Sequence, residues 1–207
     1  MKERTKEQRA YICDVQTRED DIHGNILEGI PIVYDVETDI GGMWNEIIDR
    51  GALDSADLKD VRFLVNHDVD SIPLARSRNN NENSTMQMTV EPDGLHVRVD
   101  LDTEGNPRAK ELYSAIKRQD ISGMSFMFTV KSDKWDDLDS DYPTRHITAL
   151  DKVFEVSAVT FPAYEQTTIN ARSVESGKAS LDSAREALEN ARKVEELRKA
   201  IIERCKS

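Results

Sequence analysis

The sequence contains little cysteine, no surplus of basic residues and no long apolar run. Its two cysteines, Cys13 and Cys205, stand near opposite ends of the chain without the spacing of metal ligands. Two such thiols favour a reducing cytosol over a disulfide framework. No stretch approaches the roughly 18 apolar residues that span a bilayer, and the charged start MKERTKEQRA lacks the apolar centre of a signal peptide. We therefore expect a cytoplasmic protein without a membrane partner.

The charge balance of the chain is acidic. It has 40 Asp and Glu residues against 28 Lys and Arg residues, a net charge of -12. Binding to nucleic-acid phosphates needs a basic surface, so we expect no nucleic-acid partner. Hydrophobic residues make up 38% of the 207 residues and charged residues 33%. That composition and length suit one ordinary domain with a real core and an extension.

Strand-like alternation of apolar and polar residues dominates the first 172 residues. One helix is expected from Pro107 onward, because Asn106 can act as its N-cap and proline fits the first helical position. Its apolar residues at helical spacing are Ala109, Leu112, Tyr113 and Ile116. The expected strands lie within 11–17, 29–38, 61–67, 121–130 and 151–161, with a hairpin around EPDG in 85–101. The body is therefore expected to be an α+β or mostly β domain.

The composition changes after about residue 172. Residues 178–207 hold eight basic and six acidic residues, net +2, which leaves -14 for residues 1–177. We expect residues 173–207 to form a small polar linker followed by an amphipathic helix, in which Ser183 and Glu186 are a capping-box pair. The linker contains Ser173, Ser176, Gly177 and Ser180, and the apolar stripe is Leu181, Ala184, Leu188, Ala191, Val194, Leu197 and Ile201. Such a helix docks on the body, on a second copy or on another partner.

Ser125 stands in the apolar run ISGMSFMFTV, residues 121–130. If this run is a strand, its side chains alternate between two faces. Gly123, Ser125 and Met127 then share the less apolar face, and Gly123 leaves open space beside the hydroxyl of Ser125. A packed hydroxyl gains nothing from that space, whereas a reacting one needs it. Ser125 is therefore a candidate nucleophile.

His67 ends the expected strand VRFLVNH on the same face as Phe63 and Val65. It is either a partly buried histidine bonded to backbone or a general base. Asp68 and Asp70 follow it, so NHDVD has some of the groups that bind a metal. Because no second His or Cys stands at ligand spacing, we expect neither a metal nor a cofactor.

Glu155 lies in the expected strand KVFEVSAVTF. It is either an edge-strand charge that reaches solvent or a buried carboxylate with a partner, because burial of an unpaired charge is expensive. A carboxylate can orient a histidine and stabilise its charged form. His67, Ser125 and Glu155 are thus candidates for a Ser-His-acid triad, although spacing alone does not show that they meet. The expected face of Glu155 also holds Val153, Ser157, Val159 and Phe161.

Three segments, FLVNHD, ISGMSFMF and KVFEVSAVTFPAY, resemble the signature blocks of tailed-phage prohead proteases, the capsid-maturation serine proteases related to herpesvirus assemblins. A fourth, WNEIIDRGAL, resembles that family's early block, and all four stand in the family's order over about residues 11–170. The resemblance implies a compact, mostly antiparallel β-barrel flanked by helices, and a Ser-His nucleophile pair. The protease domain is then residues 1–172, and residues 173–207 are a linker and a helical tail.

The resemblance also assigns roles by position. His67 in NHD matches the family's general base, Ser125 in GMSFMF matches its nucleophile, and Glu155 aligns with the acid of the EVS block. Ser122 is the rival nucleophile in the same block. His146 is the rival third member, because the herpesvirus relatives use a second histidine there.

The implied function is that of a serine endopeptidase that cleaves scaffold or scaffold-like segments of the major capsid protein. It would act inside the assembling prohead in the host cytoplasm, and would also cleave itself. The expected linker is exposed and extended, so we expect this self-cleavage within residues 171–180. Met127 stands where the family usually has glycine, and its side chain would narrow the substrate groove or shift the strand. The alternative is a non-catalytic scaffolding or assembly protein of the prohead, with the acidic body and the helical tail as docking surfaces.

Overall fold

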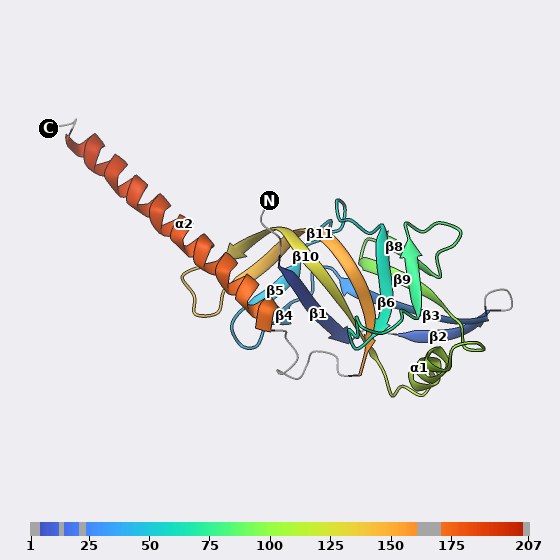
Figure 1. The fold of residues 1–207 in the computed structure, drawn as a ribbon. Coiled ribbons are helices and arrows are strands. Elements are labelled where there is room, and N and C mark those ends of the chain that lie inside the picture. The colour runs from blue at the N-terminus through green and yellow to red at the C-terminus, as the bar shows by residue number, and fades with distance from the viewer. Residues whose placement is uncertain (1–4, 13–14, 21–23, 161–170, 205–207) are drawn as a thin grey trace.

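Two β-sheets and two helices make up the computed structural model, which describes residues 5–12, 15–20, 24–160 and 171–204 (Figure 1). Cys13 and Cys205 lie outside these ranges. Within them, no helix is both long enough and apolar enough to cross a membrane.

The larger sheet has seven strands and is built on two long ones that pair antiparallel, β10 and β11. β1 pairs antiparallel with the other edge of β10, and β5 and β6 pair in parallel with different parts of β11. β4 extends the sheet beyond β5, and β7 extends it beyond β6. The strands are β1 (Lys6–Ile12), β4 (Thr38–Asp39), β5 (Asn45–Ile48), β6 (Asp60–Val65), β7 (Ala75–Arg78), β10 (Gly123–Asp136) and β11 (Thr144–Val159).

The smaller sheet has four antiparallel strands in the order β2-β3-β9-β8. β8 and β9 form the hairpin that the sequence predicts around EPDG. Apolar side chains from both sheets form one core cluster, which includes Leu27 and Val99 from the smaller sheet and Phe63 and Phe126 from the larger. The strands are β2 (Gln16–Asp20), β3 (Gly24–Val33), β8 (Met86–Glu91) and β9 (Gly94–Leu101).

The mixed α+β class is confirmed, but the closed barrel is not found. In the part of the chain that the structure describes, hydrogen-bonded pairing stops at β1, β4 and β7 in one sheet and at β2 and β8 in the other. The reason is that β11 divides its far edge between β5 and β6, so the larger sheet branches instead of curling back on itself.

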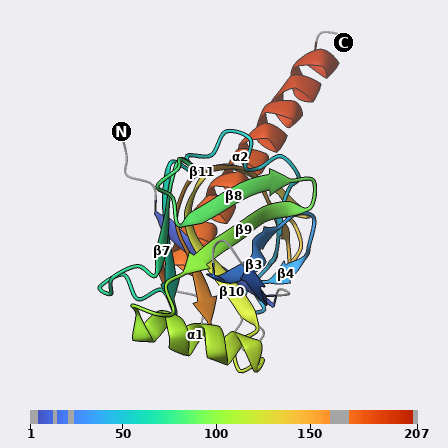
Figure 2. The same ribbon diagram turned by 90° about the vertical axis from the view of Figure 1, so that its right-hand side faces the viewer.

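The first helix, α1 (Pro107–Lys117), forms as the sequence predicts. The side chain of Asn106 accepts a hydrogen bond from the backbone N–H of Arg108, at 3.0 Å, and Pro107 opens the helix. The predicted apolar face is buried and joins the main core, and α1 closes one end of the two sheets (Figure 2). Its buried residues are Ala109, Leu112, Tyr113 and Ile116.

The second helix, α2 (Ala171–Arg204), begins earlier than expected, and the predicted linker is wrong. Ser173 and Gly177 are buried residues of this helix because its first turns dock on the body. The hydroxyl of Ser183 bonds back to the carbonyl of Ala179 within the helix, so Ser183 is not a helix start. Arg192 still pairs with Asp139 of the body at 2.6 Å, and beyond it the helix extends away from the sheets (Figure 1).

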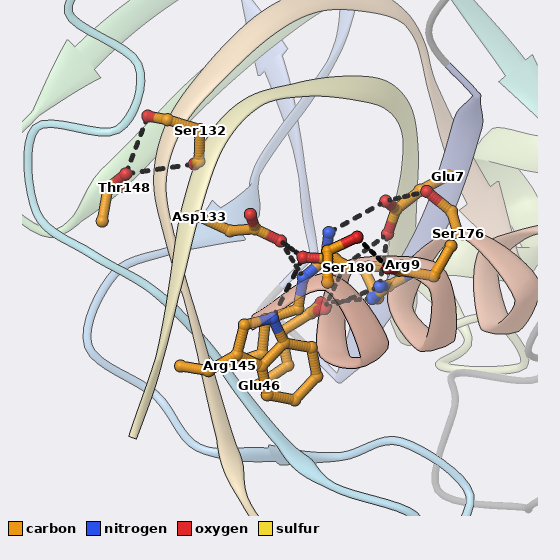
Figure 3. A network of polar contacts seen from close by, with 12 residues as sticks. Glu7, Arg9, Glu46, Ser132, Asp133, Arg145, Thr148, Ser176 and Ser180 are labelled. Carbon is orange, nitrogen blue, oxygen red and sulfur yellow. Dashed lines mark hydrogen bonds and ion pairs between the residues drawn. The ribbon is translucent and has the colours of Figure 1, made fainter. Parts of the chain in front are cut away.

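A buried charge cluster joins the N-terminal strand, the larger sheet and α2 (Figure 3). It consists of Glu7, Arg9, Glu46, Asp133 and Arg145, which come from β1, β5, β10 and β11. Arg9 contacts both Glu7 and Glu46, at 2.7 Å each through Nη2, and Arg145 contacts the same two carboxylates at 2.9 and 3.0 Å. Each charge in the cluster lies beside charges of opposite sign, and their attraction offsets the free-energy cost of removing the charges from water.

The helix α2 is tied to this charge cluster through its serines. The hydroxyl of Ser176 donates to Glu7 at 3.0 Å, and the hydroxyl of Ser180 donates to Asp133 at 2.8 Å (Figure 3). Ser173 accepts a hydrogen bond from the backbone N–H of Gln8 in β1 at 3.0 Å. The small polar residues that suggested a linker are therefore the contacts that seat the helix.

Candidate active site

His67 lies in a tight turn directly after β6, and not at the end of the strand as the sequence suggested. The strand ends at Val65, and both Asn66 and His67 have left-handed backbone conformations, with φ of 51° and 58°. Such conformations are unfavourable for residues other than glycine and persist where surrounding contacts hold them. Here the Asn66 side chain accepts a hydrogen bond from the N–H of Thr160 at 2.9 Å, and the Asn66 N–H donates to the carbonyl of Ala158.

The turn brings the imidazole of His67 against the carboxylate of Glu155. Nδ1 of His67 lies 2.6 Å from Oε1 of Glu155. The two residues come from neighbouring segments, because β6 pairs in parallel with the end of β11 that carries Glu155. With Nδ1 engaged by a carboxylate, Nε2 is left as the nitrogen that can exchange a proton with a substrate or a serine.

Glu155 is 2% exposed and lies on an interior strand of the sheet, so it is not an edge-strand charge. The sequence alternation around it is partly wrong. Val153 and Val156 both belong to the main core, although an uninterrupted strand would place them on opposite faces. The pairing register with β10 shifts between Met127 and Phe128, and this irregularity lets Glu155 point away from the core while its neighbours remain in it.

Ser157 connects Glu155 and His67, a contact that was not predicted from the sequence. Its hydroxyl donates to Oε2 of Glu155 at 2.5 Å and accepts the backbone N–H of His67 at 3.2 Å. It is fully buried. The available signal was its position two residues after Glu155, which places both side chains on one face of a strand.

Ser125 lies beside this group on the adjacent strand. It is the cross-strand partner of Ser157 in the β10–β11 pairing, so the two side chains occupy the same face. The predicted apolar face of β10 is confirmed, since Met124, Phe126 and Phe128 are buried in the main core.

The space predicted beside Ser125 is not open. Ser125 is 1% exposed, and its hydroxyl donates to the carbonyl oxygen of Arg9 in β1 at 2.7 Å. β1 lies along this edge of β10, with Ala10 opposite Ser125. The charged N-terminal segment therefore covers the candidate nucleophile, a contact that alternation in the nucleophile strand alone could not reveal.

The two rival residues lie elsewhere. Ser122 is exposed and precedes the first residue of β10. His146 pairs with Asp49 at 2.7 Å and with Asp136 at 3.3 Å, near the start of β11. The structure therefore brings His67 and Glu155 together, with Ser125 on the neighbouring strand, and gives His146 different partners.

A pocket of about 270 Å³ adjoins Glu155 on this face. Met127, two residues after Ser125 on the same side of β10, contributes to its wall. The pocket therefore offers space for a side chain next to the candidate catalytic group. Its lining is Lys6, Arg62, Leu64, Val69, Ser71, Pro73, Met127, Phe154 and Glu155.

The acids of NHDVD do not assemble a metal site. Asp68 contacts the hydroxyl of Ser71 and, at 3.6 Å, the guanidinium of Arg108. The Ser71 hydrogen bond and the charge of Arg108 lower the pKa of Asp68 below its ordinary value. Across the ranges that the structure describes, no group of three or more His, Cys, Asp or Glu side chains is arranged to hold a metal ion.

Two comparisons with known proteins found a match. A family model described as Caudovirus prohead serine protease matches residues 13–180. A solved structure of the bacteriophage T4 capsid assembly protease is similar over 74% of this chain and 98% of its own, with 14% sequence identity and a TM-score of 0.39. No curated protein matches the sequence.

Proposed function

Because this chain belongs to the Caudovirus prohead serine protease family, we propose that it is a serine endopeptidase that cleaves scaffold or scaffold-like segments of the major capsid protein, and itself. Membership in the family supports a protease role in capsid maturation, within the assembling prohead. The single observation that carries the catalytic assignment is the 2.6 Å contact between His67 and Glu155, beside the strand that holds Ser125.

The proposed reaction follows from the roles of these three groups. Oγ of Ser125 attacks the peptide carbonyl carbon while Nε2 of His67 accepts the hydroxyl proton. His67 then gives that proton to the leaving amine. Between these two proton transfers, the carboxylate of Glu155 stabilises the positively charged imidazolium. Water hydrolyses the acyl-serine by the same proton transfers and regenerates the free hydroxyl.

In the structure the hydroxyl of Ser125 donates a hydrogen bond to the backbone of β1. This resting arrangement differs from the reacting one, in which the hydroxyl faces His67. The hydroxyl must turn from the carbonyl of Arg9 toward His67 before it can attack. Rotation about the first side-chain torsion moves a serine hydroxyl between its staggered positions without moving the backbone. Access for a substrate further requires β1 or the turn after β6 to move.

Self-cleavage within residues 171–180 remains part of the proposal, with an added requirement. These residues are helical and dock on the charge cluster, whereas a protease needs extended, accessible backbone. The first turns of α2 must therefore unwind before they can enter the active site.

Coexpression with the major capsid protein tests the assignment. The parent protein should process the capsid protein, Ser125→Ala should not, and Ser122→Ala should process it normally. Both variants should fold, since each removes one small polar group. Processing by Ser125→Ala together with a loss in Ser122→Ala would move the nucleophile three residues earlier. A parent protein that assembles proheads without cleaving would favour the non-catalytic scaffolding alternative.

A further inference from the structure

We propose that Ser157 is a positioning residue, whose hydroxyl holds the carboxylate of Glu155 and the backbone of His67 in the arrangement that catalysis needs. This role rests on the proposed protease function. It concerns a residue that touches neither the substrate nor the reacting atoms and acts through the two residues that do.

The hydroxyl of Ser157 has one hydrogen, and the geometry shows where it goes. A carboxylate can only accept and a backbone N–H can only donate. The hydrogen is therefore directed to Oε2 of Glu155 at 2.5 Å, and a lone pair accepts the N–H of His67 at 3.2 Å. Hydroxyl-to-carboxylate bonds of this length are charge-assisted and stronger than neutral ones. The hydroxyl thus donates one hydrogen bond and accepts another, both within the site.

Ser157 prevents rotation of the Glu155 carboxylate. One oxygen of that carboxylate faces Nδ1 of His67 and the other faces Ser157. A carboxyl group held at both oxygens cannot turn about its last torsion, which is otherwise soft. The direction in which Glu155 accepts the imidazole hydrogen is therefore fixed by the serine.

Ser157 also supports the strained turn that presents His67. Two successive left-handed residues, Asn66 and His67, cost energy that neighbouring contacts must offset. The bond from the Thr160 N–H to the Asn66 side chain holds the first residue, and the bond from the His67 N–H to Ser157 holds the second. One buried hydroxyl thus sets both the backbone position of the base and the orientation of the acid.

The chain offers a matched control for this role. Ser77 in β7 is equally buried, and it likewise donates to a side-chain oxygen and accepts a backbone N–H, both of Asn80. Replacing Ser77 by alanine removes the same atoms from a similar setting but leaves the bonds of His67 and Glu155 in place. Ser157→Thr is the complementary variant, because it keeps the hydroxyl.

The test compares four purified proteins, each expressed as the whole chain, namely the parent, Ser157→Ala, Ser157→Thr and Ser77→Ala. One readout is the rate of labelling by a fluorophosphonate, followed by intact mass. The other is the low-field proton NMR signal of the His67 Nδ1–H, identified by its absence in His67→Ala. Thermal melting of each protein separates loss of folding from loss of positioning.

We expect Ser157→Ala to label about 10–100-fold more slowly than the parent, as for loss of a hydrogen bond to a charged group, and to lose or shift the low-field signal. Ser157→Thr should recover most of the rate, and Ser77→Ala should keep both readouts. An unchanged rate and signal in Ser157→Ala would overturn the proposal, as would an equal loss in Ser77→Ala. If the parent is not labelled at all, the proposed protease function fails. The low-field NMR signal then still shows whether Ser157 positions His67 and Glu155, because it does not depend on activity.

Discussion

Nδ1 of His67 and Oε1 of Glu155 lie 2.6 Å apart although 88 residues separate them in the chain. The contact is made by the parallel pairing of β6 with β11, followed by a left-handed turn that folds His67 back over the sheet. A buried carboxylate paired with a histidine is the arrangement that orients a general base. Ser125, on the strand next to Glu155, completes the candidate triad.

Removal of the base should be more damaging than neutralisation of the acid. His67→Ala should stop processing, because serine and histidine act as a unit. Glu155→Gln keeps the shape of the side chain but loses the charge that stabilises the imidazolium, and should slow the reaction by about 10²–10⁴-fold. His146→Ala should process at close to the parent rate, because the partners of His146 are Asp49 and Asp136.

Cleavage of coexpressed capsid protein, followed over time on gels, measures these rates. A crippled His146→Ala beside a normal Glu155→Gln would indicate a Ser-His-His triad instead.

Local signals in the sequence were sufficient for several elements. The proline and N-cap of α1 and the EPDG turn between β8 and β9 depend on neighbouring residues only, and both form as predicted. The buried apolar face of β10 followed from alternation. In the outer part of α2, Glu189 pairs with Lys193 one turn later at 2.7 Å, a contact that also depends on neighbouring residues only.

Features that depend on distant partners could not be read in this way. β1 contains the charged residues Glu7 and Arg9, which look like surface residues until Glu46 and Arg145 are placed around them. The contact of the Arg9 carbonyl with Ser125 follows from the pairing of β1 with β10, and the serines of α2 bond to carboxylates of that cluster. Likewise, the irregularity beside Glu155 reflects pairing with β10 and leaves no mark in the local pattern.

Met127 should restrict the size of the substrate side chain that binds beside the cleaved bond. Its side chain helps to line the pocket next to Glu155, at a position where the family resemblance suggests glycine. Met127→Ala should therefore enlarge the pocket and admit larger substrate side chains, with a change in preference of about 10–200-fold. Profiling both proteins with a peptide library of varied side chains measures this preference. Identical profiles would show that the pocket is not a substrate subsite.

The buried charge cluster should make the fold sensitive to the loss of one carboxylate. Glu46→Gln neutralises one of the two carboxylates that Arg9 and Arg145 share, and breaking a buried ion pair in this way costs about 3–5 kcal/mol. The matched control is Glu28→Gln, because the pair of Glu28 with Arg18 is solvent-exposed and such pairs contribute about 0–1 kcal/mol. Urea unfolding of the three proteins gives the free energies. Equal losses in both variants would mean that the cluster adds no special stability.

The same cluster predicts a direction for the dependence of stability on pH. Burial alone would raise the pKa of Glu46, but the charges and hydrogen bonds of Arg9 and Arg145 hold it below its ordinary value of 4.5. A carboxyl whose pKa is lower in the folded state stabilises the fold fully above its unfolded pKa, and that contribution is lost as the pH falls through the folded pKa. The gap in unfolding free energy between the parent and Glu46→Gln should therefore be largest above pH 4.5 and shrink in more acidic solution. A gap that does not change with pH would assign the loss to packing.

Undocking of α2 should expose the segment in which self-cleavage is proposed. A Cβ atom at Gly177 would lie 2.4 Å from Cζ2 of Trp44, and Trp44 is 1% exposed and packs edge-on against Trp135. Gly177→Leu should therefore push the first turns of α2 off the body and accelerate cleavage within residues 171–180. Ala179→Leu adds similar bulk at an exposed position of the same helix and should have little effect.

Intact-mass spectrometry of both variants, each with and without Ser125→Ala, measures the cleavage. Shortening of Gly177→Leu that persists with Ser125→Ala would reveal a contaminating protease. A full-length Gly177→Leu protein that still processes the capsid protein would remove the self-cleavage proposal, because an unwound segment beside an active protease should be cut.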